Sequence, residues 1–374
     1  MTADWKCSSH MEDTSHNYSA TIAYIVPHST LNNAIPINIS RRKRLLESLG
    51  CRVILVQHSE GKFLKNCIVL WKLKKILDCI IIRIDGSCLL DKYTLNKILL
   101  SDVPIVWEIH GFPEERFAFS HDIYAQWFVW KNNVKRRLLS GITSASICVS
   151  HELMKFAKKK LYIRKSAVIP NFINTEEYQH HPKNNPLARF IRNDSFLVLW
   201  GGDAGLPWNA TDIMQKAAKR IAGYDKNVLF VFIGSNYWYP VQNTTNIILL
   251  NPITHAQFTT YVARSNVCLA LYRSFKFFPF YLYPMKLLDY LLAGKPIIAS
   301  NLGAISTIIT HEINGLLTNN SVDAIVNDIL KLKRHKNLAR KLSRNARRTA
   351  IVKCNSITAE KRYRELFISL EILR

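Results

Sequence analysis

One short segment of the chain brings together residue types that suit phosphate binding. Pro284 opens an expected helix over 284–293, where a proline costs no hydrogen bond because the first turn leaves that N–H unpaired. The remaining backbone N–H groups of this turn form a ready site for an anion. Lys286 places a cation in the same turn, where it opposes the helix dipole unless it has an anionic partner. We therefore interpret Lys286 as a phosphate contact.

Two further features could serve the same phosphate-bearing ligand. Asp289 follows Lys286 by three residues, and its carboxylate suits hydrogen bonds from ribose hydroxyls. Gly201 and Gly202 end an apolar run and would let the backbone approach a diphosphate closely. The alternatives are a solvated i,i+3 pair, worth about a few tenths of a kcal/mol, and a plain strand-to-helix turn.

A histidine and several acids gather near the end of another apolar run. His110 lies in the run 104–111, where a histidine is either a functional group or a structural residue with satisfied hydrogen bonds. Glu108, Glu114 and Glu115 are candidates for contacts with an acceptor molecule, or else they lie on a loop surface.

An alternating α/β chain is needed to position these residues. The expected strands are 21–27, 53–57, 79–85, 104–111, 144–150, 166–172, 196–202, 228–234, 246–250, 267–272, 296–300 and 315–318. The expected helices are 40–50, 117–140, one beginning near 151, 208–223, 254–264, 284–293, 321–335 and 337–352. Apolar strands separated by helices predict parallel sheets that are covered on both faces.

The alternation stops over 173–194, which is polar and carries two prolines. We interpret this segment as a linker between an N-terminal domain, 1–172, and a C-terminal domain, 195–355. Ligands of open α/β folds bind at the carboxyl ends of the strands, so the two domains would share a cleft.

The composition narrows the class of protein. The chain has 374 residues, 48% hydrophobic and 21% charged, which excludes a disordered chain. No run approaches the roughly 18 apolar residues needed to span a bilayer, and the N-terminus lacks the apolar core of a secretory signal. The eight cysteines form no CxxC pair or zinc-type spacing, which favours reduced structural thiols in a cytoplasmic protein.

The net charge of +24, from 51 Lys and Arg against 27 Asp and Glu, indicates an anionic partner. The basic runs 41–44, 135–137 and 158–160 are expected to be solvated helix faces. One cluster is more specific and consists of Trp127, Phe128, Trp130, Lys131, Lys135, Arg136 and Arg137. It suits either docking on an anionic membrane or packing under a charged face.

The segment 281-YLYPMKLLDYLLAGKPIIAS-300 resembles the donor-binding segment of retaining GT-B glycosyltransferases of the family 4 type, S-P-x-K-x-x-E-Y-x-A-x-G-K-P-V-I-A-S. Further segments resemble that family's landmarks in the family's order: 141–156, 167–178, 302–320 and 336–367. The resemblance implies two Rossmann-like domains around an interdomain cleft. It also implies a C-terminal helix, 356–374, that crosses back to the N-terminal domain.

The resemblance assigns roles to individual residues. It places His110 against the transferred sugar and makes Lys286 a contact of the leaving diphosphate, so both are candidate catalytic residues. The candidate donor-binding residues are Gly201, Gly202, Arg273, Tyr283, Pro284, Met285 and Asp289. No metal site and no cofactor are expected, because the nucleotide-diphosphate sugar is itself the donor substrate.

Several positions depart from the family pattern. The two glutamates that the family spaces by seven residues become Tyr281 and Asp289, so the first carboxylate, which usually contacts the donor sugar, is lost. The family's Arg and Lys after the first strand of the C-terminal domain are absent from 201–212, which leaves phosphate contacts to Lys286, Arg273 or Lys276.

The sequence therefore predicts a retaining, metal-independent glycosyltransferase that acts on a glycan or lipid-linked acceptor in cell-surface polysaccharide or glycolipid synthesis. We expect a cytoplasmic protein that can associate peripherally with the inner face of a membrane. The alternatives are a nucleotide-sugar hydrolase or epimerase, and a degenerate GT-B scaffold that binds membranes or polyanions. No recognised nucleic-acid-binding module is present in the sequence, so we expect no nucleic-acid partner.

Overall fold

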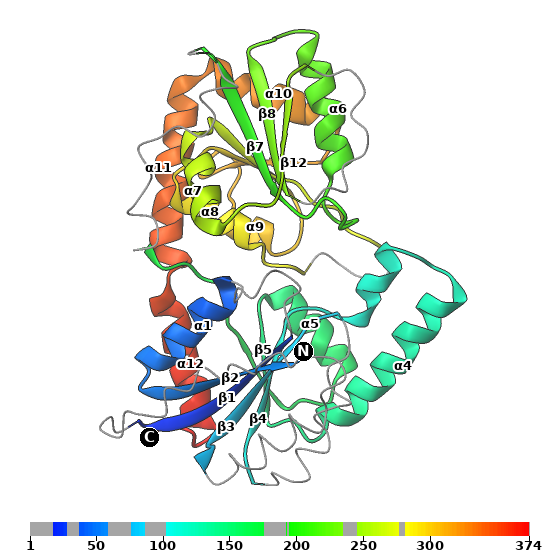
Figure 1. The fold of residues 1–374 in the computed structure, drawn as a ribbon, viewed down its shortest axis with the longest axis vertical. Helices are drawn as coiled ribbons and strands as arrows, with labels where there is room; N and C mark the ends of the chain where they lie inside the picture. Colours follow the sequence, from blue (N-terminus) through cyan, green and yellow to red (C-terminus); the bar gives the residue numbers. More distant parts are fainter. Residues whose placement is uncertain are drawn as a thin grey trace, which may run out of the picture.

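The structure of the chain is a computed structural model that describes residues 18–27, 37–58, 76–86, 102–175, 192, 194–234, 245–276 and 281–373. Most of the expected linker, 173–194, lies outside these residues. The described residues form two α/β domains, one above the other in Figure 1, each built on a parallel sheet.

The N-terminal sheet has the strand order β2-β1-β3-β4-β5-β6. Its strands are β1 (Ala20–Pro27), β2 (Cys51–His58), β3 (Cys79–Ile84), β4 (Ile105–Ile109), β5 (Ala145–Cys148) and β6 (Lys165–Val168). The helices of this half are α1 (Ile37–Ser48), the 3-10 helix η3 (Pro113–Ala118), α4 (Ile123–Ser140) and α5 (His151–Lys160). Buried apolar clusters lie on both faces of the sheet, because strands such as β4 are buried along their whole length.

The C-terminal sheet has the order β12-β11-β10-β7-β8-β9. Its strands are β7 (Phe196–Gly202), β8 (Val228–Gly234), β9 (Ile247–Leu250), β10 (Val267–Ala270), β11 (Ile297–Ser300) and β12 (Leu316–Thr318). Its helices are α6 (Thr211–Ala222), α7 (His255–Arg264), α8 (Met285–Leu292), α9 (Ile305–Ile308), α10 (Val322–Arg334) and α11 (Lys336–Lys353). Apolar clusters again cover both faces, and the predicted fold class is confirmed.

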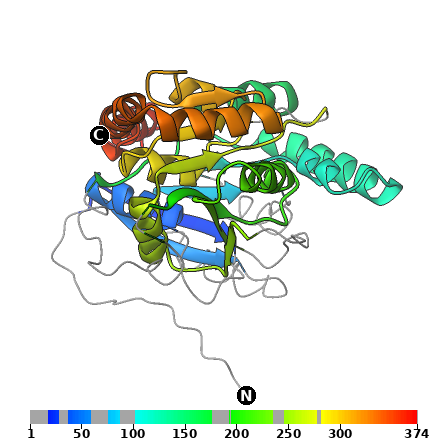
Figure 2. The ribbon, with the colours of Figure 1, turned by 90° about the horizontal axis from the view of Figure 1, so that it is seen from above.

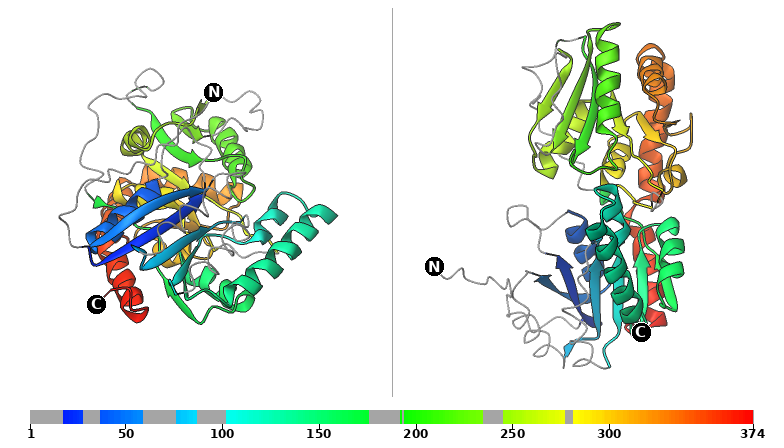
Figure 3. Two further views of the ribbon diagram at one scale, coloured as in Figure 1. Left: turned by 60° about the horizontal axis from the view of Figure 1, so that its bottom comes forward. Right: turned by 90° about the vertical axis from the view of Figure 1, so that its right-hand side faces the viewer.

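The chain returns to the N-terminal domain through its last helix, α12 (Ser356–Ser369). Asn355 caps this helix, and its Tyr363 and Phe367 are buried in the same cluster as Tyr24 of β1. Figure 1 shows α11 beside the C-terminal domain and α12 beside the N-terminal one, and the right-hand view of Figure 3 shows the same stacking of the two sheets. The crossover therefore joins the two halves at a point distant in sequence from the linker.

Helix α4 extends away from the body of the N-terminal domain in Figures 1, 2 and 3. The region 117–140 was expected to be one helical stretch, but η3 precedes α4 and Asp122 caps α4 by accepting from the backbone N–H of Ala125. The side chains of Ala125, Val129 and Arg136 lie on its buried stripe.

The expectation that the basic runs are solvated is wrong for three arginines. Arg41 and Arg42 in α1 and Arg136 in α4 are each at most 3% exposed. Arg136 donates to the carbonyl of Gly111 and contacts that of Asp85. Backbone carbonyls and carboxylates satisfy these charges in the interior, which the run of like charges in the sequence does not indicate.

Five described cysteines are free and buried, at positions 51, 79, 148, 268 and 354. In the described part of the chain, no helix combines the length and the apolar character that a membrane-spanning segment needs.

Candidate functional site

Lys286 lies in the first turn of α8, and its Nζ atom lies beside Gly202 at the carboxyl end of β7. Its Nζ atom lies 4.5 Å from the centre of the Trp200 ring and 5.2 Å from that of Tyr272. Burial lowers the pKa of Lys286 to about 7, with only a partial opposing effect from Asp203. Among the described residues no carboxylate forms an ion pair with this half-buried ammonium group, and Asp203 is the one acid that offsets part of the effect of burial.

The two glycines that end β7 have different surroundings. Gly202 has φ of +153°, and a Cβ at this position would collide with Nζ of Lys286. A Cβ at Gly201 would instead collide with the ring of Phe258, and the Gly201 N–H donates to the Tyr290 hydroxyl over 3.1 Å. Gly202 therefore lets the ammonium group lie close to the backbone, whereas Gly201 is explained by side-chain packing.

Asp289 is 3% exposed and faces two basic side chains. The Nε2 atom of His255 lies 3.2 Å from its Oδ1, and the guanidinium of Arg41 lies 3.6 Å from the same oxygen. Arg41 belongs to α1 of the N-terminal domain, so Asp289 carries an interdomain ion pair. A ribose hydroxyl would have to share or displace these partners.

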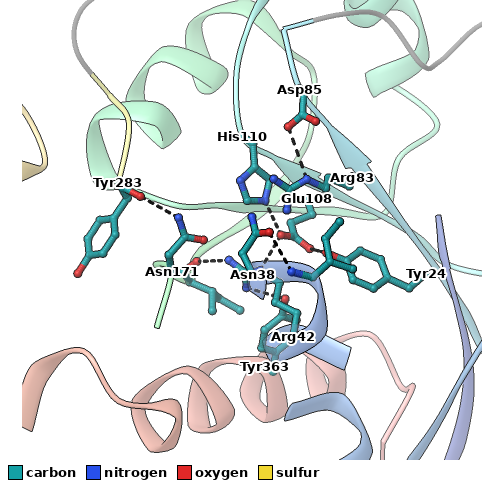
Figure 4. Close-up of polar contacts among 12 residues, drawn as sticks. Tyr24, Asn38, Arg42, Arg83, Asp85, Glu108, His110, Asn171, Tyr283 and Tyr363 are labelled. Carbon is teal, nitrogen blue, oxygen red and sulfur yellow. Dashed lines mark hydrogen bonds and ion pairs between the residues drawn. The ribbon is translucent and has the colours of Figure 1, made fainter. Parts of the chain in front are cut away.

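The remaining predicted donor-binding residues occupy several environments. Arg273 is ion-paired with Asp212 at the start of α6. Pro284 is the N-cap residue of α8, and Met285 packs partly against the core of the C-terminal domain. The carbonyl of Tyr283 accepts from Asn171 over 2.8 Å, as Figure 4 shows, and its hydroxyl lies 3.8 Å from Sγ of Cys354. Tyr283 therefore lies between the domains.

His110 follows directly after β4 and contacts a buried carboxylate. Its Nε2 atom lies 2.5 Å from Oε1 of Glu108, which is itself 0% exposed (Figure 4). Burial, together with the charge of Arg83, lowers the pKa of His110 against the opposing effect of Glu108. The His110 side chain keeps 10% of its surface exposed, so a ligand can reach the ring.

Glu108 has two further partners in the N-terminal domain. The Tyr24 hydroxyl donates to Oε2 over 2.7 Å, and Nε of Arg42 lies 2.7 Å from Oε1. Burial alone would raise the pKa of Glu108, but the charge of Arg42 and the hydrogen bond from His110 hold it well below its usual range. Arg42 donates in turn to the Tyr363 hydroxyl of α12 over 2.8 Å and to the carbonyl of Ile169 over 3.2 Å.

Tyr281 occupies the position at which the resembled family has its first glutamate, and it is fully buried against the N-terminal domain. Its hydroxyl donates to Oε1 of Glu115 over 2.8 Å and accepts from the backbone N–H of Phe112 over 3.1 Å. Its carbonyl accepts from the Ser150 hydroxyl over 2.6 Å. Tyr281 is thus a contact between the domains.

Glu115 and Glu114 differ although they are adjacent. Burial raises the pKa of Glu115 to about 7, and its carboxylate lies against the backbone of Gly86 and Gly111 at the ends of β3 and β4. Glu114 accepts from Asn133 over 2.7 Å and pairs with Lys160, so it ties α4 and α5 to η3. Only Glu115 lies at the strand ends where a ligand would bind.

Sequence reasoning missed Arg42 and Tyr363 as partners of the predicted site. Arg42 could have been found, because it lies three residues before Leu45 and four before Leu46 on the apolar stripe of its helix. Nothing in the sequence indicates that Tyr363 contacts Arg42, which lies more than 300 positions earlier in the chain.

In the described residues, no group of three or more His, Cys, Asp and Glu side chains is placed to hold a metal ion. A cavity of about 160 Å³ lies between the domains and is lined by Tyr283, Cys354 and Arg362, among others, but by neither His110 nor Lys286. It is smaller than the roughly 300 Å³ of typical ligand pockets.

Comparison with known proteins agrees with this architecture. Residues 196–335 match the sequence profile of the family described as glycosyl transferases group 1. No protein of curated function matches the sequence.

Three solved structures share the fold of nearly the whole chain. HepE from Anabaena, solved with UDP and glucose, has 15% identity and a TM-score of 0.68, covering 94% of this chain and 100% of its own. Sucrose-phosphate synthase from Thermosynechococcus elongatus has 16% identity and a TM-score of 0.70, covering 94% and 99%. WaaG, a glycosyltransferase involved in lipopolysaccharide biosynthesis, has 14% identity and a TM-score of 0.64, covering 91% and 98%. The domain match and the shared GT-B fold support a glycosyltransferase.

Proposed function

We propose that this protein transfers a sugar from a nucleotide-diphosphate donor to a glycan or lipid-linked acceptor, with retention of the anomeric configuration and without a metal ion. The observation that carries the proposal is Lys286, a half-buried ammonium group in the first turn of α8 without a carboxylate partner among the described residues. A cation in that position costs stability, because burial disfavours its charged form and the helix dipole opposes it. An anionic ligand would remove both costs.

The donor diphosphate has the chemistry that this position requires. The free N–H groups of the first turn of α8 and the Lys286 ammonium group would neutralise its charge, and Gly202 would admit it beside β7. When the bond from the anomeric carbon to the diphosphate breaks, the leaving oxygen gains negative charge, which the same groups stabilise. HepE, which shares the fold, was solved with UDP, so UDP is the natural first probe for this chain.

The reaction itself would take place between the two domains. The acceptor oxygen forms its bond to the anomeric carbon on the face from which the diphosphate departs, and its proton passes to the departing phosphate. His110, at the end of β4, would contact the transferred sugar. Asp289 would hold the ribose after exchange of its contacts with His255 and Arg41.

A thermal-shift screen with a panel of nucleotide sugars tests donor binding, because a ligand of the native state raises its melting temperature. Product analysis with and without glycan and lipid-linked acceptors then follows with each donor that binds. We expect a transfer product that retains the anomeric configuration, formed in the presence of EDTA. Free sugar or an epimerised donor would instead indicate a hydrolase or an epimerase. No shift with any donor would favour a degenerate scaffold.

The exposed side of helix α4 supports the proposal that the protein docks on an anionic membrane, where it would bind its acceptor. This side carries large apolar side chains that are 41–79% exposed: Ile123, Tyr124, Trp127, Trp130, Val134 and Leu138. Cations lie over the neighbouring rings, with Nζ of Lys131 4.5 Å from the centre of the Trp127 ring. Arg137 similarly lies 4.7 Å from the Tyr162 ring. Aromatic residues combined with lysine and arginine suit the interface of an anionic bilayer.

Vesicle co-sedimentation tests this surface. We expect binding to vesicles with anionic headgroups, weaker binding to neutral ones, and a loss of about tenfold or more in the double variant Trp127→Gln, Trp130→Gln. Tyr224→Gln, at a residue that is 74% exposed on the other domain, is the matched control. Equal binding of the double variant and the control would exclude α4 as the docking surface.

A further inference from the structure

The contact between Glu108 and His110 fixes where the imidazole carries its proton. Glu108 is ionised, because Arg42 and His110 hold its pKa well below the usual range despite burial. An ionised carboxylate only accepts hydrogen bonds, so the Nε2 atom at 2.5 Å must be the donor. In the neutral ring the other nitrogen, Nδ1, then has no proton and is a hydrogen-bond acceptor.

The Nδ1 atom of His110 is the ring nitrogen that Glu108 does not contact. Among the described residues the structure gives it no hydrogen-bond partner, and the side chain is 10% exposed. The charged groups that act on the ring are Glu108 in β4, Arg83 in the neighbouring β3 and Asp85, which directly follows β3. A neutral imidazole with a free acceptor recognises a hydroxyl or N–H donor and not another acceptor.

Glu108 is held in place by side chains from two other elements, β1 and α1, and by His110, as Figure 4 shows. Tyr24 of β1 binds one carboxylate oxygen, and Arg42 of α1 and His110 meet at the other. The guanidinium of Arg42 lies 5.8 Å from the centre of the Tyr363 ring and donates to its hydroxyl. The terminal helix α12 therefore reaches His110 through Arg42 and Glu108.

We propose that Glu108 is a positioning residue that holds His110 with its proton on Nε2, so that Nδ1 accepts a hydrogen bond from a substrate hydroxyl. We further infer that Tyr363 of α12 supports this arrangement through Arg42. The substrate hydroxyl rests on the proposed sugar transfer, whereas the tautomer is a property of the free protein. The C-terminal helix α12 would then help to position His110, in addition to packing against the N-terminal domain.

The test is a measurement of the ring nitrogens of His110 by ¹H–¹⁵N NMR across pH on the free protein, with His110→Gln used for assignment. We expect the Nε2–H tautomer in the wild type and a pKa of His110 that falls by about 1 in Glu108→Gln, because the carboxylate charge is lost while the shape is kept. A proton on Nδ1 in the wild type, or an unchanged pKa in Glu108→Gln, would overturn the proposal.

Tyr363→Phe tests whether α12 supports the position of His110 through Arg42 and Glu108. This variant also tests the proposal if Glu108→Gln does not fold. Its matched control is Tyr162→Phe, which removes a hydroxyl that accepts from Arg137 at the surface. We expect the His110 ¹⁵N signals to shift in Tyr363→Phe and to stay unchanged in Tyr162→Phe. Identical spectra in the two variants would overturn the role of α12.

A kinetic comparison separates this proposal from the proposed function. Where transfer is observed, we expect Glu108→Gln to lower kcat/KM about tenfold or more and Tyr363→Phe about fivefold, the latter being the loss of one hydrogen bond. A wild type with the expected tautomer but without transfer activity would contradict the proposed function and leave the assignment of the His110 proton intact.

Discussion

The two sides of the candidate site treat buried charge in opposite ways. On the N-terminal side, Glu108 is ionised and completely enclosed, and every strong charge near it has a partner within the protein. On the C-terminal side, Lys286 is half-buried between two aromatic rings, and no described carboxylate pairs with it. The first arrangement fixes the orientation of the carboxylate, whereas we propose that the second binds an anionic ligand.

The difference follows from the cost of burying an ion. A buried carboxylate is tolerated only with several hydrogen-bonding partners, and these partners also lock its orientation. A buried ammonium group without a counter-ion gives up its proton more easily, which is why the pKa of Lys286 falls to about 7. A paired charge therefore indicates a positioning role, and an unpaired one indicates a binding role.

The largest expected effect is a loss of stability when the buried ion pair between Arg42 and Glu108 is broken. Arg42→Met removes the main counter-charge of Glu108, and a broken buried pair costs about 3–5 kcal/mol of unfolding free energy. Arg44→Met, on the exposed side of the same helix, should cost less than about 0.5 kcal/mol. Urea denaturation measures both. Similar losses in the two variants would mean that the buried pair has no special importance.

On the unpaired side, Lys286→Ala should lower turnover about 100-fold, because one group that stabilises the leaving diphosphate is lost. The control is Lys216→Ala, at an exposed lysine of α6. The measurement is a transfer assay with a donor found in the nucleotide-sugar panel. An unchanged rate in Lys286→Ala would remove Lys286 from the mechanism.

Adding a single methyl group at Gly202 tests whether the space beside Lys286 is needed for UDP binding. Gly202→Ala would push a Cβ into the ammonium group at a backbone φ of +153°, so we expect UDP affinity to fall about tenfold. Gly223→Ala adds the same atom at the end of α6, where the nearest neighbour is a carbonyl oxygen at 3.5 Å. Calorimetric titration of both variants should separate them, and equal affinities would show that the space is not used.

A smaller effect is expected from Glu115, whose pKa burial raises to about 7. Between pH 4.5, the ordinary value, and pH 7 the folded state holds a proton that the unfolded state has released. Stability from this group is therefore complete below pH 4.5 and is lost as the pH rises to 7. Glu115→Gln should become more stable than the wild type across this range, by an amount on the order of 1 kcal/mol. Parallel stability curves would contradict the raised pKa.

The sequence predicted the fold closely because its signals are local. All twelve expected strands occur within a few residues of their predicted bounds, since apolar β-branched runs such as 228–234 allow few other structures. Lys286 was identified by the conflict between its charge and the helix dipole, which is also a local feature.

The side-chain partners could not be predicted, because they depend on contacts between distant segments. Arg41 was expected to be solvated, yet it pairs with Asp289, 248 positions later in the chain. Tyr281 was noted only as a lost glutamate, and its contact with Glu115 depends on how the two domains pack. The predicted ribose role of Asp289 and diphosphate role of Gly201 remain predictions, now with known protein partners to compete against.

We propose that the donor diphosphate is the anionic partner of Lys286, which forms no ion pair with a described carboxylate in the free protein. Titration calorimetry with UDP at pH 8, in two buffers of different ionisation enthalpy, measures the protons taken up on binding. If the claim holds, the wild type binds UDP and takes up close to one proton, because the diphosphate restores the charge of a lysine whose pKa is about 7 in the free protein. Lys286→Met should bind more weakly and take up none. Equal UDP affinity and equal proton uptake in the two proteins would show that Lys286 does not bind the diphosphate.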